Sequence, residues 1–178
     1  MNLGIKKDEV KLVSYDERWQ HAFNITKKEL KKCLKLQDVQ IEHIGSTSIK
    51  GIQAKPVLDI LIGVENIDAL DEAFFKALRS VGFYRLKVER PNEIVCAKFT
   101  DTSFETKTHF IHIVDYEKEK WHQMLFFRNY LNANEEIKQQ YQDLKIAFFT
   151  TNLKGIDAYT EYKDQFVKAI FAKMEEKR

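Results

Sequence analysis

The stretch IEHIGSTS at residues 41–48 is followed, after a short loop, by VLDILIGV at residues 57–64. The first stretch mixes β-branched and polar residues up to Gly45, which predicts a strand that ends in a turn. The second is apolar at nearly every position, which predicts a central strand covered on both faces. We therefore expect these two strands to form the centre of the fold, with the remaining chain packed around them.

The turn formed by Gly45, Ser46, Thr47 and Ser48 has the composition of a phosphate-binding turn. Glycine lets the main chain approach an anion closely, and successive N–H groups and hydroxyls can then bind it. An isolated Gly-Ser-Thr is more often a tight turn whose hydroxyls cap the next segment. We predict phosphate binding because a strand that carries a carboxylate follows this turn.

That carboxylate is Asp59, which lies inside the apolar run. A buried carboxylate without a partner is costly, so Asp59 is expected to have a partner, an altered pKa or a bound metal ion. The alternative is a strand-end aspartate that only accepts hydrogen bonds from backbone N–H groups. We predict Asp59 to be catalytic and to bind a metal.

Composition places the chain among ordinary globular proteins. Its 178 residues fit one domain, predicted here to span residues 1–178. The 44% of apolar residues excludes wholesale disorder, and the 31% of charged residues excludes a membrane protein. A net charge of +2 does not indicate a nucleic-acid partner. Residues 1–7 lack the apolar core of a signal peptide, so we expect a cytoplasmic protein with no membrane partner.

The rest of the chain divides into recognisable elements. An edge strand is predicted at residues 10–14, helices at 16–36 and 67–81, strands at 83–88, 94–100 and 107–114, and helices at 118–132, 134–150 and 157–175. Helices that are segregated from a strand meander favour an α+β fold with a mixed β-sheet, in which the last three helices form a C-terminal segment.

Several of these motifs together resemble the GrpB family, whose members are similar to the minimal nucleotidyltransferase fold. The resemblance lies in Tyr15-Asp16 with Trp19, residues 42–48 and 54–60, Thr108–His112, Phe127–Leu131, Tyr141 with Lys145, and Tyr159 with Lys163. It implies a nucleotidyltransferase-like mixed β-sheet flanked by helices. Such enzymes carry two carboxylates one residue apart on one strand face, and Leu61 occupies the second position here.

The pair His109 and His112 has the spacing of a helical metal site but falls in a predicted strand. Alternate side chains of a strand point to opposite faces, so both histidines cannot be ligands of one ion. By the resemblance, His112 stands where nucleotidyltransferases carry a third carboxylate. We therefore predict it to be catalytic and to bind a divalent metal with Asp59, with Mn²⁺ or Zn²⁺ favoured over Mg²⁺. The alternative is a core histidine hydrogen-bonded to Asp59 or Glu42.

Further polar residues are predicted to surround the same turn. Four cations are candidates for neutralising phosphate charge, namely Lys55, Lys98, Arg128 and Lys145. Three others are predicted to line the cleft, namely Glu42, His43 and His109. Lysines and arginines on helices are usually only solvated, so these assignments depend on the fold bringing them to Gly45.

Two classes of function remain open. In the first, the protein is an enzyme that transfers a nucleotidyl or phosphoryl group with the help of a metal ion. In the second, it is a noncatalytic module that has kept the phosphate turn, and Leu61 favours this reading. Some domains that resemble this one are joined to dephospho-coenzyme A kinase, so a nucleotide or a coenzyme A precursor is the expected ligand.

Overall fold

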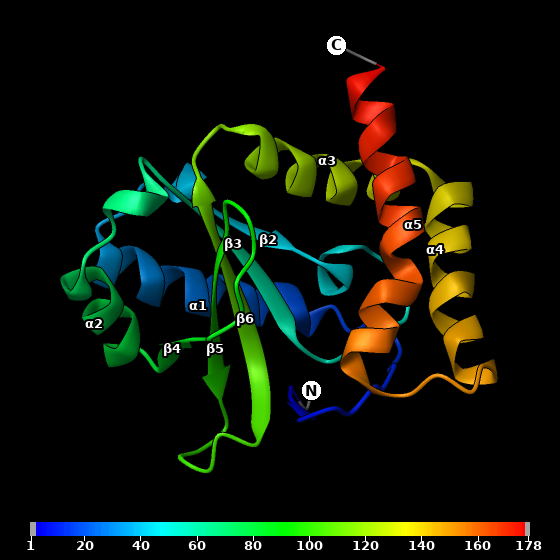
Figure 1. Cartoon of the computed structure of the whole chain (residues 1–178), viewed down its shortest axis with the longest axis horizontal. Helices are drawn as coiled ribbons and strands as arrows, with labels where there is room; N and C mark the ends of the chain where they lie inside the picture. The colour runs from blue at the N-terminus through cyan, green and yellow to red at the C-terminus, as the bar shows by residue number, and fades with distance from the viewer. Residues whose placement is uncertain (1–2, 177–178) are drawn as a thin grey trace.

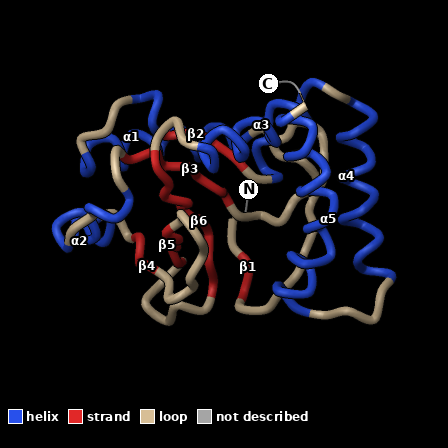
Figure 2. Tube along the Cα trace, turned by 45° about the horizontal axis from the view of Figure 1, so that its top comes forward, coloured by secondary structure: helices blue, strands red, loops and turns tan. Residues whose placement is uncertain are grey.

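The computed structural model describes residues 3–176, which form one mixed β-sheet with helices on both faces (Figure 1; Figure 2). The strands are β1 (Ile5–Lys6), β2 (Ile41–Ile44), β3 (Leu58–Val64), β4 (Phe83–Arg85), β5 (Ile94–Phe99) and β6 (Thr106–Asp115). The helices are α1 (Arg18–Leu34), α2 (Glu72–Ser80), α3 (Glu119–Ala133), α4 (Glu135–Ala147) and α5 (Gly155–Glu175). The strand order β2-β3-β6-β5-β4, with β1 paired to the start of β6, confirms the predicted α+β class.

The centre of the sheet is the pair β3 and β6. These strands are parallel, and their register places Asp59 beside Phe110 and Leu61 beside His112. The other neighbouring pairs in the sheet are antiparallel, so the sheet is mixed as the sequence predicted. Because paired residues of adjacent strands share a face, this register decides which side chains of β6 meet Asp59.

The two faces of β3 differ in what covers them. Leu58, Ile60 and Ile62 point toward α1 and α2 and form the larger core with Phe23 and Leu78. These aliphatic side chains are fully buried, and burying each contributes roughly 1.5–3 kcal/mol. Leu61 lies on the opposite face, in a smaller cluster with Val114 of β6 and Trp121 of α3. Asp59 shares that second face.

The last three helices form the C-terminal segment predicted from the sequence, beside the sheet (Figure 1). Their core contains Leu131 of α3, Tyr141 of α4 and Ile170 of α5. Ile49 and Ile52, from the loop between β2 and β3, complete this core. The loop that precedes Asp59 is thereby fixed against the helical segment.

Two local predictions are wrong. Residues 10–14 form no strand and contribute only a bridge between Val13 and Ala54, whereas β1 pairs with β6. The helix predicted at 67–81 is divided into a single 3₁₀ turn at Ile67–Ala69 and α2. The division arises because the Asp71 side chain accepts a hydrogen bond from Phe74 N at 3.0 Å and so caps a new helix start. No helix among the described residues is long and apolar enough to cross a membrane.

Candidate functional site

A cleft of about 540 Å³ opens on the Asp59 face of the sheet. Its floor is formed by β5 and β6, and one wall is the first three turns of α5. The lining residues are Lys55, Asp59, Leu86, Val88, Arg90, Val95, Lys107, Phe110, His112, Ile156, Asp157, Thr160, Glu161 and Asp164. Of the residues predicted as site residues, Lys55, Asp59 and His112 therefore lie together here.

His112 joins two carboxylates. Its Nε2 lies 3.5 Å from Asp59 Oδ1, and its Nδ1 lies 2.6 Å from Glu93 Oε1. Glu93 has only 2% of its side chain exposed and also pairs with Lys120 at 2.9 Å and Arg90 at 3.1 Å. The expected juxtaposition of Asp59 and His112 is confirmed, and it depends on the register of β3 with β6.

This arrangement favours a charged imidazole. Burial alone would lower the pKa of His112, but its hydrogen bonds to Asp59 and Glu93 raise that pKa to about 9. Burial would raise the pKa of Glu93, yet His112 and Lys120 lower it to about 2. The pKa of Asp59 is also lowered, since His112, Lys55 and Lys163 outweigh burial. His112 is thus an imidazolium between two carboxylates at neutral pH.

These residues do not fit a metal centre. Among the described residues, no group of three His, Cys, Asp or Glu side chains is placed to hold an ion. Both ring nitrogens of His112 face carboxylates, so neither offers a free lone pair to a metal. Leu61, at the second carboxylate position, is fully buried in the smaller cluster. The predicted metal on Asp59 and His112 finds no suitable set of ligands.

Lysines gather next to Asp59. Nζ of Lys55 lies 5.3 Å from the centre of the Tyr159 ring, and Nζ of Lys163 lies 4.1 Å from the same centre. Burial, together with the neighbouring charge of Lys55, lowers the pKa of Lys163 to about 7, although Asp59 acts in the opposite direction. The pKa of Lys55 is lowered by burial as well. Lys107, another lining residue, adds its charge nearby.

Lys145 was predicted to contact phosphate, but it does not reach the cleft. Its side chain is fully buried, and its ammonium group donates a hydrogen bond to the Gln53 carbonyl. Burial and the charge of Lys163 lower the pKa of Lys145 to about 7. The prediction is wrong because the side chain is enclosed in the C-terminal helical segment, where it holds the loop that precedes β3.

The Gly45 turn lies against Asp59. Gly45 has φ 69° and ψ −175°, a conformation that is almost exclusive to glycine. A Cβ atom here would collide with the Asp59 carboxylate and lie 2.8 Å from Asp59 Cβ. The turn therefore fixes the position of Asp59, although none of the described residues that line the cleft comes from residues 45–48.

Two of the three hydroxyls in this turn are structural. Thr47 is 2% exposed, and its Oγ1 donates to the Val57 carbonyl at 3.3 Å. Ser48 Oγ donates to the Gly45 carbonyl at 2.6 Å. Both hydroxyls are thus engaged within the protein, Thr47 with Val57 and with His43 Nε2 at 3.0 Å and Ser48 within the turn, which disfavours the predicted phosphate contacts from these side chains. The Ser46 hydroxyl has no hydrogen-bond partner among the described residues.

Three predicted site residues lie on the opposite face of the sheet, under α1. His43 stacks on Phe23 with ring centres 4.9 Å apart. His109 is 8% exposed and packs its ring edge-on against Phe83. Lys98 pairs with Glu29 of α1 at 3.5 Å. These three predictions are wrong because strand alternation directs the side chains away from Asp59.

Glu42 and Arg128 lie on the correct face but outside the cleft. Arg128 of α3 donates from Nη1 to Glu42 Oε2 at 2.6 Å and to the His43 carbonyl at 2.8 Å. This pair ties α3 to β2. Glu42 was predicted to line the cleft and Arg128 to bind phosphate, but neither lines the cleft, and the two form an ion pair with each other.

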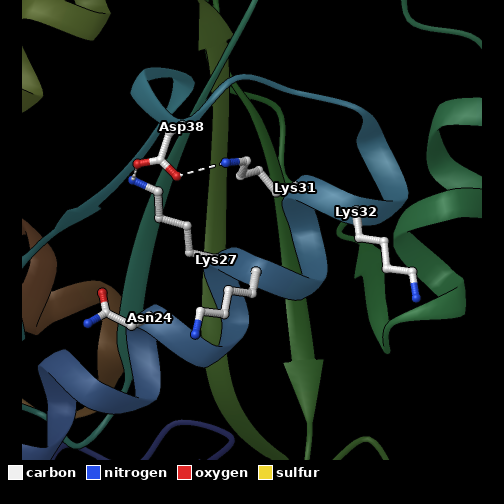
Figure 3. A pocket seen from close by; sticks show the side chains of 6 residues that line it. Asn24, Lys27, Lys31, Lys32 and Asp38 are labelled. Carbon is white, nitrogen blue, oxygen red and sulfur yellow. Dashed lines mark hydrogen bonds and ion pairs between the residues drawn. The ribbon is translucent and has the colours of Figure 1, made fainter.

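A second hollow, of about 560 Å³, lies on α1 (Figure 3). It is lined by Asn24, Lys27, Lys28, Lys31, Lys32 and Asp38. Lys27 and Lys31 each pair with Asp38 at 3.1 Å, and Asp38 is largely exposed. These contacts are those of a solvated helix face, so the cleft beside Asp59 is the stronger candidate.

Sequence reasoning missed Lys163, Glu93 and Lys107 as site residues. A signal for Lys163 was present, because Tyr159-Lys163 repeats the four-residue spacing of Tyr141-Lys145, which places each lysine over its tyrosine on a helix. Glu93 had no such signal. It lies in a turn between two strands, and only the fold brings it to His112.

Known proteins resemble this chain over almost its full length. A sequence model of the family described as GrpB protein matches residues 9–173. Glutamate-rich protein GrpB of Alkalihalophilus pseudofirmus is 39% identical over 173 residues, which cover 97% of this chain and 99% of that protein. UPF0157 protein YqkA of Bacillus subtilis is 32% identical over 162 residues, which cover 91% of this chain but 46% of the relative.

Solved structures agree with these matches. The crystal structure of conserved protein GrpB from Enterococcus faecalis superposes with a TM-score of 0.79 at 28% identity, and covers 94% of this chain and 98% of that one. A Cid1 poly(U) polymerase with bound MgGTP gives a TM-score of 0.50 at 16% identity, over 72% of this chain and 42% of that chain. The second likeness concerns the fold alone and confirms the predicted nucleotidyltransferase-like architecture.

We expect Gly45→Ala to lower the free energy of unfolding by about 1–3 kcal/mol, because a glycine-only conformation is lost and the new methyl group displaces Asp59. Urea unfolding measures the loss. Gly51→Ala is the matched control, since Gly51 also has positive φ but nothing lies within 4 Å of an added Cβ. Equal losses in both variants would show that the contact with Asp59 carries no energy.

The second prediction concerns pH. The folded-state pKa of His112, about 9, exceeds the ordinary 6.5, so its ion pairs stabilise the fold fully below pH 6.5 and are lost as pH rises through 9. His112→Gln should therefore cost about 1–3 kcal/mol at pH 6 and much less at pH 10. The variant is compared with the wild type at each pH. Lys163, with a pKa of about 7, changes the stability of both proteins over the same range, and this contribution cancels in the difference.

The His112 pKa itself is measurable by NMR of the imidazole C–H signals, assigned with His112→Gln. Glu93→Gln should lower this pKa, since one of the two carboxylate partners is removed. A wild-type midpoint near 6.5 would contradict the charged bridge.

Proposed function

The chain belongs to the GrpB family and has a nucleotidyltransferase-like fold, and on this basis we propose that it binds a nucleotide or another phosphate-bearing small molecule in the cleft beside Asp59. A coenzyme A precursor is one such ligand. The proposed contacts come from Lys55 and Lys107, which line the cleft, and from Lys163, which is not a lining residue but lies over the same Tyr159 ring as Lys55. A ligand of this kind accords with the cytoplasmic location expected from the sequence.

The observation that carries this proposal is lysine charge that acts on Asp59 from a distance but forms no direct salt bridge. Among the described residues, Lys55 and Lys163 contact the ring of Tyr159 but form no salt bridge. The nearby carboxylate, Asp59, is already paired with His112. Partly burying these ammonium groups costs desolvation free energy, and the contacts with Tyr159 do not offset it. A bound phosphate would supply the missing negative charge.

The opposite wall of the cleft differs in charge. Asp157 and Glu161 of α5 are exposed at its rim, and Asp164 pairs with Lys168 at 2.6 Å. These carboxylates would repel phosphate, so the phosphate belongs on the lysine side. The apolar residues Leu86, Val88 and Ile156 leave room for the less polar part of a ligand.

A second candidate function is transfer of a nucleotidyl or phosphoryl group. The observation in its favour is His112, which borders the cleft and carries a proton that it could donate to a leaving oxygen. Release of pyrophosphate from a nucleoside triphosphate, followed by ³¹P NMR, tests this role. His112→Gln should abolish such release if it is observed.

We expect a thermal-shift screen of nucleotides, coenzyme A precursors and inorganic phosphates to reveal a stabilising ligand, because a ligand at a hundred times its Kd adds about 2.7 kcal/mol. Calorimetry then gives the Kd. Lys55→Gln should weaken binding about tenfold by removing a charge-assisted contact.

The matched control for that variant is Lys98→Gln, because Lys98 lies on the other face of the sheet and pairs with Glu29. It should leave the Kd unchanged. Equal weakening by both substitutions would point to a general charge effect, and loss confined to Lys27→Gln or Lys31→Gln would move the site to the hollow on α1 (Figure 3).

The fourth prediction separates function from stability. Lys163→Met should raise the free energy of unfolding of the ligand-free protein by about 1–3 kcal/mol at pH 6, because the cost of a desolvated ammonium group disappears. At about 2–4 °C per kcal/mol, the rise in Tm is measurable by calorimetry. The same variant should bind phosphate more weakly. A lower Tm with unchanged binding would identify Lys163 as purely structural.

A further inference from the structure

Resting on the proposed function, we propose that the cleft binds its phosphate group without a divalent metal ion, and that lysines of the chain supply the positive charge that a metal would supply. The proposal makes a phosphate monoester or diphosphate the recognised group, with Lys55, Lys107 and Lys163 as its counter-charges. The inference concerns how the phosphate is bound, in addition to which class of ligand binds.

The first support is the environment of the Asp59 carboxylate. Oδ1 faces Nε2 of His112 at 3.5 Å. Oδ2 is packed against Gly45, so closely that an added Cβ atom would collide with it. The two oxygens that would coordinate an ion are thus directed at the imidazole and at the backbone of the turn.

The second support is the lack of further ligands. Leu61 is fully buried and cannot contribute an oxygen. Glu93, the other carboxylate near His112, is held by His112, Lys120 and Arg90 and has 2% of its side chain exposed. Mg²⁺ generally needs one or two open carboxylates besides the phosphate oxygens and water. Asp59, with 29% of its side chain exposed, is the only one of these two carboxylates that reaches the cleft, and it already faces His112.

The third support is the position of the cations. Lys55 precedes β3, Lys107 lies at the start of β6, and Lys163 lies on α5, so they approach from three separate elements. Lys55 and Lys107 line the cleft together with Asp59. Lys107 and Lys163 each act electrostatically on Lys55, and lysines can neutralise a phosphate as point charges. Of the three, Lys55 and Lys163 act directly on the Asp59 carboxylate, where a metal would otherwise be expected.

The experiment is calorimetric titration of the full chain with inorganic pyrophosphate and with ATP, once with EDTA and once with Mg²⁺ or Mn²⁺. We expect binding in EDTA that a metal tightens by no more than about threefold, or weakens, because the metal reduces the charge of the free polyphosphate. Binding that is more than about threefold tighter with a metal overturns the inference and leaves the proposed function intact. Absence of binding in both conditions, from a protein that unfolds cooperatively, overturns the proposed function and this inference with it.

The sign of the effect of Asp59→Asn is the second test. In a site without metal, this change removes a negative charge beside the bound phosphate, so pyrophosphate should bind about two- to fivefold more tightly in EDTA. In a metal site the same change would remove a ligand and weaken binding. Weakened binding that is restored by no metal concentration would also overturn the inference, since Asp59 would then position the site in another way. Lys98→Gln serves again as the unaffected control.

Discussion

The parallel pairing of β3 with β6 is the constraint on which the site depends. Its register sets Asp59 beside Phe110 and Leu61 beside His112, so that the carboxylate and the imidazole share one face of the sheet. A shift of one residue would turn His112 into the core beneath α1 and bring His109 to Asp59. The buried aliphatic residues of β3 and β6 oppose such a one-residue shift, because it would turn the apolar side chains of one strand out of the core.

Several charged side chains are buried around Asp59 and His112, and the free energy lost by desolvating them is offset by the packing of the apolar core. Glu93 is almost completely buried, yet three cations surround it, and each ion of the bridge is compensated by another. The lysines beside Tyr159 are not compensated in the same way. Apolar residues at these positions would avoid the cost of desolvating ammonium groups, so the presence of lysines here is a reason to assign them a ligand.

The likeness to nucleotidyltransferases concerns the sheet and the turn more than the chemistry. Gly45 keeps its glycine-only conformation and its contact with Asp59. Leu61, however, packs with Val114 and Trp121, where it joins the sheet to α3. A carboxylate at this position would now be buried among apolar groups. The chain therefore shares the fold, while Leu61 belongs to the packing and Asp59 to the His112 bridge.

The sequence by itself determined the central strands, the α+β class and the three C-terminal helices, because hydrophobic periodicity is a local property. The resemblance to nucleotidyltransferases supplied the expectation that Asp59 and His112 share a face, and the pairing of β3 with β6 decided it. Only the tertiary structure decided which cations reach that face. Lys98 lies on the face of β5 that is covered by α1, where it pairs with Glu29. Arg128 is paired with Glu42, and Lys145 is buried against the Gln53 carbonyl. Lys163 reaches the Asp59 face because α5 packs there. These outcomes depend on contacts between residues distant in the chain, which no local pattern records.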